Sequence, residues 1–186
     1  MIVSAGKNET FPFATPVGVG LIESAINMTR ICLFDKPEYI LFVGSAGSYG
    51  DHKIFDIVES SSASNVELSF LSNDSYTPID NVVRSEDQRY QKDVIVNSSN
   101  YITTNSLISS QYKDYGIAIE NMEFFSIVSV AKEFDIDVRG IFVVTNYTNG
   151  NAHKDFISNH NKAMDLLVEH LEKRKIIVPN VPRGTA

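Results

Sequence analysis

The chain has 186 residues, of which 43% are hydrophobic, with a formal net charge of −7 and a pI near 5.0. We expect residues 1–178 to form one domain with a sizeable core and residues 179–186 to form a tail. The acidic charge argues against a nucleic-acid partner. The single Cys32 excludes an internal disulfide, and its apolar surroundings indicate a core thiol. Because no apolar run is long enough to span a membrane and no signal peptide is recognisable, we expect no membrane contact and a cytoplasmic location.

The first predicted elements are a short strand at residues 1–5 and a helix that follows the glycine-rich turn at 16–20. Residues 39–43 are a continuous apolar run, which is typical of a strand buried on both faces beneath helices. The glycine- and serine-rich stretch 44–50 is predicted to be a loop, and residues 54–59 to be a further strand.

The second half of the chain alternates between strand and helix patterns. A polar segment at 73–93 is expected to cover the outside. The elements predicted after it are strands at 94–96, 116–119 and 138–145 and helices at about 122–134 and 155–175. This alternation predicts an α/β fold with a central mixed β-sheet flanked by helices in three layers.

Two polar positions beside these elements suit a nucleoside. Glu123 lies at the start of a helix, and its carboxylate can accept hydrogen bonds from two vicinal hydroxyls. Asn146 ends the strongest strand pattern, and its carboxamide can donate and accept at the edge of a heterocyclic base. A sugar and a base bound side by side indicate a nucleoside as the ligand.

Four motifs occur in a characteristic order along the chain. They are Val17-Gly18-Val19-Gly20, Lys36-Pro37-Glu38-Tyr39-Ile40 with Val43-Gly44-Ser45-Ala46-Gly47, Asn121-Met122-Glu123, and Thr145-Asn146. Together they resemble the purine nucleoside phosphorylase and nucleosidase superfamily, which includes methylthioadenosine/S-adenosylhomocysteine nucleosidase and futalosine hydrolase. The resemblance covers residues 2–171. It implies cleavage of the N-glycosidic bond of a purine-type nucleoside.

The resemblance assigns the sugar and the base to separate side chains. Glu123 would accept hydrogen bonds from the ribose 2′ and 3′ hydroxyls, and Met122 would pack beneath the sugar. Asn146 would meet N7 and the exocyclic group of the purine. An amide cannot act as a general acid, but it can stabilise charge that develops on N7 and O6. Asn146 therefore favours a 6-oxopurine or a similar base.

The resemblance also implies contacts around the base and the nucleophile. Tyr101 and Ile102 would form the surface against which the base stacks. Ser45 would lie near phosphate or the nucleophilic water, and Gly47 of the same stretch would contact the substrate. No metal and no organic cofactor are expected, and the resemblance implies a homo-oligomer, a dimer or larger.

Two departures from the family pattern bear on the nucleophile. Phosphorolytic members carry a phosphate-binding arginine where this chain has Phe42, and such an arginine would supply a charge-assisted pair. The first βαβ part of the family fold is expected to be shortened, and Glu9 and Lys7 are weak substitutes for the acid that activates water. We therefore expect a nucleosidase. The alternatives are a phosphorylase that uses inorganic phosphate and a catalytically impaired nucleoside-binding protein.

Plainer interpretations of these residues also exist. Glu123 could be an exposed partner of a helix dipole, Asn146 a turn residue, and Tyr101 a half-buried aromatic residue at the end of a strand. His153 and His160 would share one face of the last helix. Because no metal-ligand spacing surrounds them, both are predicted to be solvated side chains.

Overall fold

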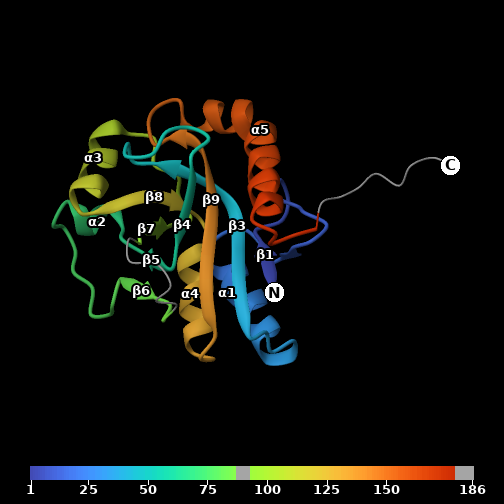
Figure 1. Cartoon of the computed structure of the whole chain (residues 1–186). Coiled ribbons are helices and arrows are strands. Elements are labelled where there is room, and N and C mark those ends of the chain that lie inside the picture. The colour runs from blue at the N-terminus through green and yellow to red at the C-terminus, as the bar shows by residue number, and fades with distance from the viewer. Residues whose placement is uncertain (87–92, 179–186) are drawn as a thin grey trace.

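The computed structural model describes residues 1–86 and 93–178 (Figure 1). The predicted tail at 179–186 and residues 87–92 of the predicted polar segment lie outside the described residues. The strands are β1 (Ile2–Ser4), β2 (Thr15–Pro16), β3 (Tyr39–Ser48), β4 (Ile57–Ser60), β5 (Ser62–Ser64), β6 (Val82–Arg84), β7 (Ile95–Ser98), β8 (Ile117–Asn121) and β9 (Asp137–Tyr147). The helices are α1 (Leu21–Phe34), α2 (Leu68–Leu71), α3 (Ser106–Asp114), α4 (Phe124–Lys132) and α5 (Ala152–Lys173). Within this part of the chain, no helix combines the length and the apolar character that crossing a bilayer requires.

All these strands belong to one mixed sheet. Strand β3 pairs in parallel with β1 and with β9, and antiparallel with β8. From β8 the sheet continues through β7 and β5 to β6, and β4 pairs antiparallel with β9. The predicted α/β fold with a mixed sheet is confirmed.

Helices cover both faces of the two long central strands, β3 and β9 (Figure 1). Phe42 and Phe142 are fully buried in a cluster with residues of α1 and α4. Val43 and Val143, the next residues along each strand, pack under Leu167 of α5 on the other face. Because successive side chains of a strand point to opposite faces, a strand covered on both sides is apolar throughout. The prediction of a strand buried on both faces is therefore confirmed.

Gly140 makes room for a cluster of three phenylalanine rings in the core. The rings of Phe42, Phe124 and Phe142 have centroids 5.1–5.9 Å apart. A Cβ atom at Gly140 would lie 2.3 Å from the ring of Phe142, so only glycine fits there. Phe42, at the position where phosphorolytic relatives were expected to carry arginine, is thus a core residue.

Several local predictions differ from the structure. The predicted loop at 44–50 is wrong for residues 44–48, because β3 continues to Ser48 and pairs with β9. Helix α3 was not predicted, since it is short and largely polar, and neither were the short elements α2, β2, β5 and β6. Helix α5 begins at Ala152, three residues before the predicted start.

The edge of β3 that faces β1 and β8 is only partly paired. Strand β1 pairs with Leu41 and Phe42, whereas β8 pairs with Gly47 and Ser48. Neither strand pairs with residues 43–46. This gap in the sheet positions the candidate site.

Candidate functional site

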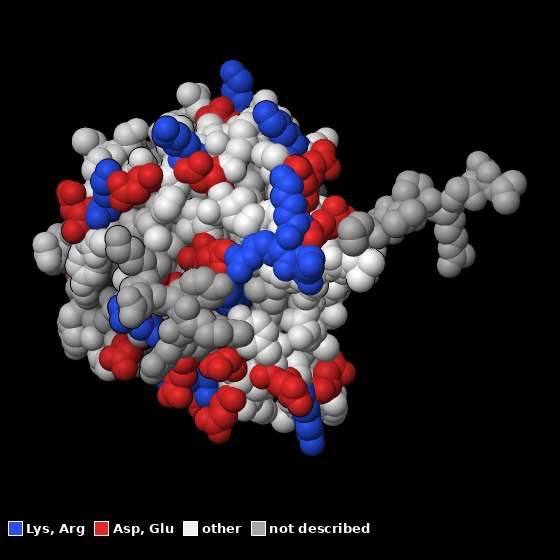
Figure 2. Space-filling view, viewed as in Figure 1, with Lys and Arg blue, Asp and Glu red and all other residues white. Residues whose placement is uncertain are grey.

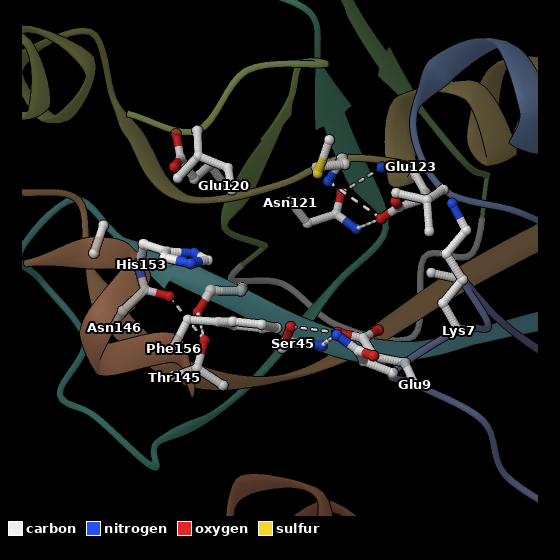
Figure 3. Close-up of a pocket in the computed structure, with 18 of the residues that line it drawn as sticks. Lys7, Glu9, Ser45, Glu120, Asn121, Glu123, Thr145, Asn146, His153 and Phe156 are labelled. Atoms are coloured by element: carbon white, nitrogen blue, oxygen red, sulfur yellow. Dashed lines mark hydrogen bonds between the residues drawn. The ribbon is translucent and has the colours of Figure 1, made fainter. Parts of the chain in front are cut away.

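A cavity of about 310 Å³ opens beside the gap on β3, a volume in the range of small-molecule sites (Figure 3). Its walls come from the segment after β1, from β3, from the segment after β7, from the β8–α4 junction, from the end of β9 and from the start of α5. Every site residue predicted above lines it: Ser45, Gly47, Tyr101, Ile102, Met122, Glu123 and Asn146. The fold therefore brings together residues that are far apart in the sequence.

At the unpaired edge of β3, a carboxylate accepts the hydrogen bond of a free backbone N–H group. Glu9 is buried, and one of its oxygens, Oε1, accepts a hydrogen bond from the backbone N–H of Ser45 at 3.1 Å and another from the Ser45 hydroxyl. Burial raises the pKa of Glu9, while the hydrogen bonds from Ser45 and the charge of His160 lower it. Oε2 of Glu9 lies where a Cβ atom at residue 44 would come within 2.6 Å, so Gly44 is needed for this placement.

Glu123 is 5% exposed and faces the same cavity. Its Oε1 accepts from the backbone N–H of Gly20 at 2.9 Å, and its Oε2 accepts from Nδ2 of Asn121 at 2.8 Å and from the N–H of Met122 at 3.2 Å. Burial raises the pKa of Glu123 to about 7; the hydrogen bond from Gly20 lowers it and the charge of Glu9 raises it. The interpretation of Glu123 as an exposed helix-dipole partner is wrong.

Glu123 also serves the start of helix α1. Gly20, the residue before this helix, has φ 85° and offers no side-chain cap. The free N–H groups there are satisfied from elsewhere: Gly20 donates to Glu123, and Leu21 donates to Oδ1 of Asn100 at 2.9 Å. The carboxylate thus supports the fold as well as the cavity, at the positive end of a helix.

Asn146 projects from an irregular point of the sheet. Residues 46 and 47 of β3 pair with Val144 and Asn146 of β9, so Thr145 is an extra residue, as in a β-bulge. Asn146 is 5% exposed; its Oδ1 accepts from the Thr145 hydroxyl at 2.8 Å, and its Nδ2 donates to the carbonyl of Tyr147 at 3.2 Å. One amide hydrogen and one lone pair remain for a ligand. The interpretation as a turn residue is wrong, because Asn146 lies within β9.

Gly47 keeps space beside Asn146. A Cβ atom at this position would lie 3.1 Å from Nδ2 of Asn146 and 3.3 Å from Cγ of Glu120. Gly47 therefore contributes only backbone to the cavity wall.

A third buried carboxylate holds the segment after β7. Glu120 accepts from the Tyr49 hydroxyl at 2.7 Å and from the backbone N–H and hydroxyl of Thr103 at 3.0 and 2.7 Å. Burial raises the pKa of Glu120, and these hydrogen bonds lower it. The segment carries Tyr101, which is 84% exposed at the cavity, and Ile102. Tyr101 is therefore not the half-buried strand-end aromatic of the plainer interpretation.

Among the side chains that line the cavity, Glu120, His153 and Phe156 were not predicted as site residues, and Glu9 was named only as a weak substitute. No local pattern shows that the carboxylate of Glu9 reaches β3. His153 and Phe156 are three residues apart and so share a face of α5, but nothing in the sequence shows that this face meets the end of β9. Histidine was predicted to be solvated, and His153 is indeed exposed, yet it also lines the cavity.

Charged side chains of both signs share the face shown in Figure 2, where Asp and Glu lie beside the described Lys and Arg side chains. Across residues 1–86 and 93–178, no group of three or more His, Cys, Asp or Glu side chains is placed to hold a metal ion.

The fold is a mixed β-sheet between helices, and its cavity lies where strands β3, β8 and β9 end or separate. The family model of the phosphorylase superfamily matches residues 3–173. The chain belongs to this superfamily. A sequence search of curated proteins found no significant match.

Solved structures share the fold at low sequence identity. A Helicobacter pylori MTAN D198N mutant with 5′-methylthioadenosine in its active site aligns with a TM-score of 0.78 and 16% identity, covering 94% of this chain and 96% of that one. Native futalosine hydrolase of Helicobacter pylori gives the same values. The 5′-methylthioadenosine/S-adenosylhomocysteine nucleosidase of *S. pneumoniae*, with a transition-state inhibitor, aligns with a TM-score of 0.73 and 13% identity, covering 91% and 95%.

Proposed function

We propose that this protein hydrolyses the N-glycosidic bond of a purine-type nucleoside. The observation that carries the proposal is the convergence of Glu9, Glu123 and Asn146 on one cavity. In this proposal, Glu123 accepts hydrogen bonds from the ribose 2′ and 3′ hydroxyls and Asn146 faces the purine. Membership of the phosphorylase superfamily and the nucleosidases among the structural relatives support this class of reaction.

Hydrolysis needs a base for the attacking water. Glu9 is suited to this role, because burial raises its pKa and makes its carboxylate a better proton acceptor. Both hydrogen bonds from Ser45 go to Oε1 of Glu9, so Oε2 is the oxygen with lone pairs left to accept a proton from water. In this proposal, the Ser45 hydroxyl orients Glu9, and the water lies between Glu9 and C1′ of the ribose.

Phosphorolysis is the alternative that the charges disfavour. A phosphate dianion at this point would meet the carboxylates of Glu9 and Glu123. Among the described residues that line the cavity, Lys7 is the only lysine or arginine, and Phe42 lies in the core. Phosphate would therefore bind without the arginine that usually pairs with it.

The test is to identify the products with and without phosphate. Purified protein is incubated with inosine or adenosine, and the released base and sugar are separated by chromatography. A nucleosidase yields free ribose at a rate that does not depend on phosphate. Ribose 1-phosphate, formed only when phosphate is present, would show a phosphorylase. Release of hypoxanthine in preference to adenine would support a 6-oxopurine as the base opposite Asn146.

A catalytically impaired nucleoside-binding protein is the second candidate, and the amide of Asn146 favours it. An amide cannot give a proton to the departing base. Such a protein would be stabilised against heating by nucleosides, as ligand linkage requires, and would release no base.

A further inference from the structure

The departing base needs a proton that Asn146 cannot supply. When the bond between C1′ and N9 breaks, its electron pair passes to the base, and protonation at N7 stabilises this leaving group. The carboxyl groups at the cavity already accept hydrogen bonds from the protein. Glu120 and Glu123 each accept three hydrogen bonds from the protein, and Glu9 is bound to Ser45. A proton donor for the base must therefore be sought elsewhere in the cavity wall.

His153 lies on the same side of the cavity as Asn146. Figure 3 shows its imidazole pointing into the cavity beside Asn146, whereas Lys7 lies at the other end, near Glu9 and Glu123. Imidazole is the side chain that most readily gives and takes a proton near neutral pH. The imidazole of His153 makes no hydrogen bond with the part of the protein that the structure describes, so it is available to a ligand.

The backbone around His153 holds it near Asn146. Helix α5 begins at Ala152, a short connection after the end of β9. The N–H of Ala152 donates to the carbonyl of Asn149 at 2.9 Å, and Nδ2 of Asn159 donates to the carbonyl of Thr145 at 2.8 Å. The first two turns of α5 are therefore tied to the bulge that presents Asn146. Placement of His153 follows from these backbone contacts, not from contacts of its own side chain.

We infer that His153 is the general acid that protonates the leaving base, an inference that rests on the proposed function. The imidazolium of His153 gives a proton to N7 as the C1′–N9 bond breaks and its electron pair moves into the base. The oxygen of water bonds to C1′, and a proton of that water passes to Glu9. The products are neutral base and ribose. Exposed His153 then regains a proton from solvent, and Glu9 releases its proton.

Two substrates with different leaving groups test the inference. Inosine needs protonation of its base, whereas p-nitrophenyl β-D-ribofuranoside releases a phenolate that is stable without a proton. Removing a general acid lowers the rate by about 100-fold or more. His153→Asn is therefore expected to lower kcat for inosine by about 100-fold and kcat for the nitrophenyl riboside by less than about 3-fold. Added imidazole is expected to restore part of the activity of His153→Ala toward inosine.

The controls separate this inference from the proposed function. Lys154→Ala changes the next residue of α5, which is exposed and does not line the cavity, and is expected to leave both rates unchanged. Thermal unfolding checks that each variant is folded. Equal losses on both substrates, or no loss on either, would overturn the role of His153 while leaving the hydrolase intact. If the unaltered protein cleaves the riboside but no purine nucleoside, the inference also fails. If it cleaves neither, the proposed function itself is overturned.

Discussion

The two ends of the cavity are built in different ways. At the carboxylate end, around Glu9 and Glu123, the acidic side chains are buried and receive hydrogen bonds from β3, from the start of α1 and from the β8–α4 junction. At the amide end, around Asn146 and His153, an exposed imidazole stands beside a buried amide. The segment with Tyr101 is bound near both ends, because Asn100 accepts from the N–H of Leu21 at the start of α1 and Thr103 donates to Glu120.

This difference separates residues that support both folding and activity from residues that can be changed with little effect on folding. A buried carboxylate that satisfies backbone N–H groups is part of the folded structure, and its removal leaves those donors without a partner. An exposed side chain at the cavity satisfies no buried donor of the protein. Substitutions at the carboxylate end should therefore have the largest effects on stability, and substitutions of exposed side chains the smallest.

The largest expected effect is that of Glu123→Gln. The variant keeps an oxygen for the N–H of Gly20, but its amide nitrogen would face Nδ2 of Asn121 and the N–H of Met122 and cannot accept from them. In the proposed site, the ribose diol also loses one acceptor. We expect kcat/KM for the nucleoside to fall on the order of 1,000-fold. Glu123→Ala should add a loss of about 1–3 kcal/mol in the free energy of unfolding, because buried donors are left unpaired.

Steady-state kinetics and thermal unfolding measure these two effects separately. Glu133→Gln, at the exposed end of α4, is the matched control and should change neither quantity. Base release at an unchanged rate in Glu123→Gln would place the sugar elsewhere.

The next effect is that of Glu9→Gln. An amide cannot take a proton from water, so kcat should fall on the order of 100-fold while KM changes little. Because the buried amide can still accept from Ser45, the fold should be retained, as circular dichroism would show. A variant with the activity of the unaltered protein would mean that water is activated by another group.

The pH dependence follows from the raised pKa of Glu123, about 7. As the pH falls below about 7, the carboxyl group of Glu123 becomes protonated. It can then no longer accept hydrogen bonds from both ribose hydroxyls, so kcat/KM should fall by up to about tenfold per pH unit. Stability changes in the opposite direction. Between the usual value of 4.5 and about 7, the folded state binds more protons than the unfolded state, so the free energy of unfolding falls as the pH rises.

A pH series of kinetics and of thermal unfolding tests both signs. In Glu123→Gln, the decrease of stability with rising pH should be smaller. A pH profile of stability identical in the two proteins would contradict the assignment.

Sequence patterns were sufficient for the central layers of the fold, because apolar runs report burial directly. The run at 39–43 and the strong strand at 138–145 were found for this reason, since both faces of β3 and β9 are covered. The continuation of β3 through Gly44 to Ser48 was missed. The residues there are small and polar because the cavity and Glu9 lie against them. Local strand propensity cannot predict a strand whose composition is set by such tertiary contacts.

The candidate site was predictable only where residues form a motif. Glu123 and Asn146 lie at the ends of predicted elements, so the sequence could indicate that both line one cavity. Glu9 and His153 reach the cavity through tertiary contacts: Glu9 by bonding to an unpaired strand edge, His153 by the docking of α5 at the bulge of β9. Neither contact leaves a periodic or spaced pattern in the sequence.

A smaller effect at the carboxylate end is expected from Gly44→Ala. The added Cβ atom would lie 2.6 Å from Oε2 of Glu9 and 3.2 Å from the ring of Phe42, so the carboxylate must move. We expect kcat to fall about tenfold and the free energy of unfolding to fall by about 1–3 kcal/mol, as for other overpacked sites. Gly150→Ala is the control, because its Cβ atom would meet nothing within 4 Å. Equal behaviour of the two variants would show that Glu9 tolerates displacement.

The smallest effect is expected from Tyr101→Ala, at the rim. The side chain is 84% exposed, so its loss should change the free energy of unfolding by less than about 0.5 kcal/mol. Stacking of a base on an aromatic ring is worth about 1–3 kcal/mol, so KM should rise at least about fivefold while kcat stays unchanged. Tyr76→Ala, equally exposed but outside the cavity lining, should leave KM as it is. If Tyr101→Ala instead lowered kcat and left KM unchanged, Tyr101 would act during bond cleavage, and this exposed segment would be as tightly coupled to the chemistry as the buried carboxylates.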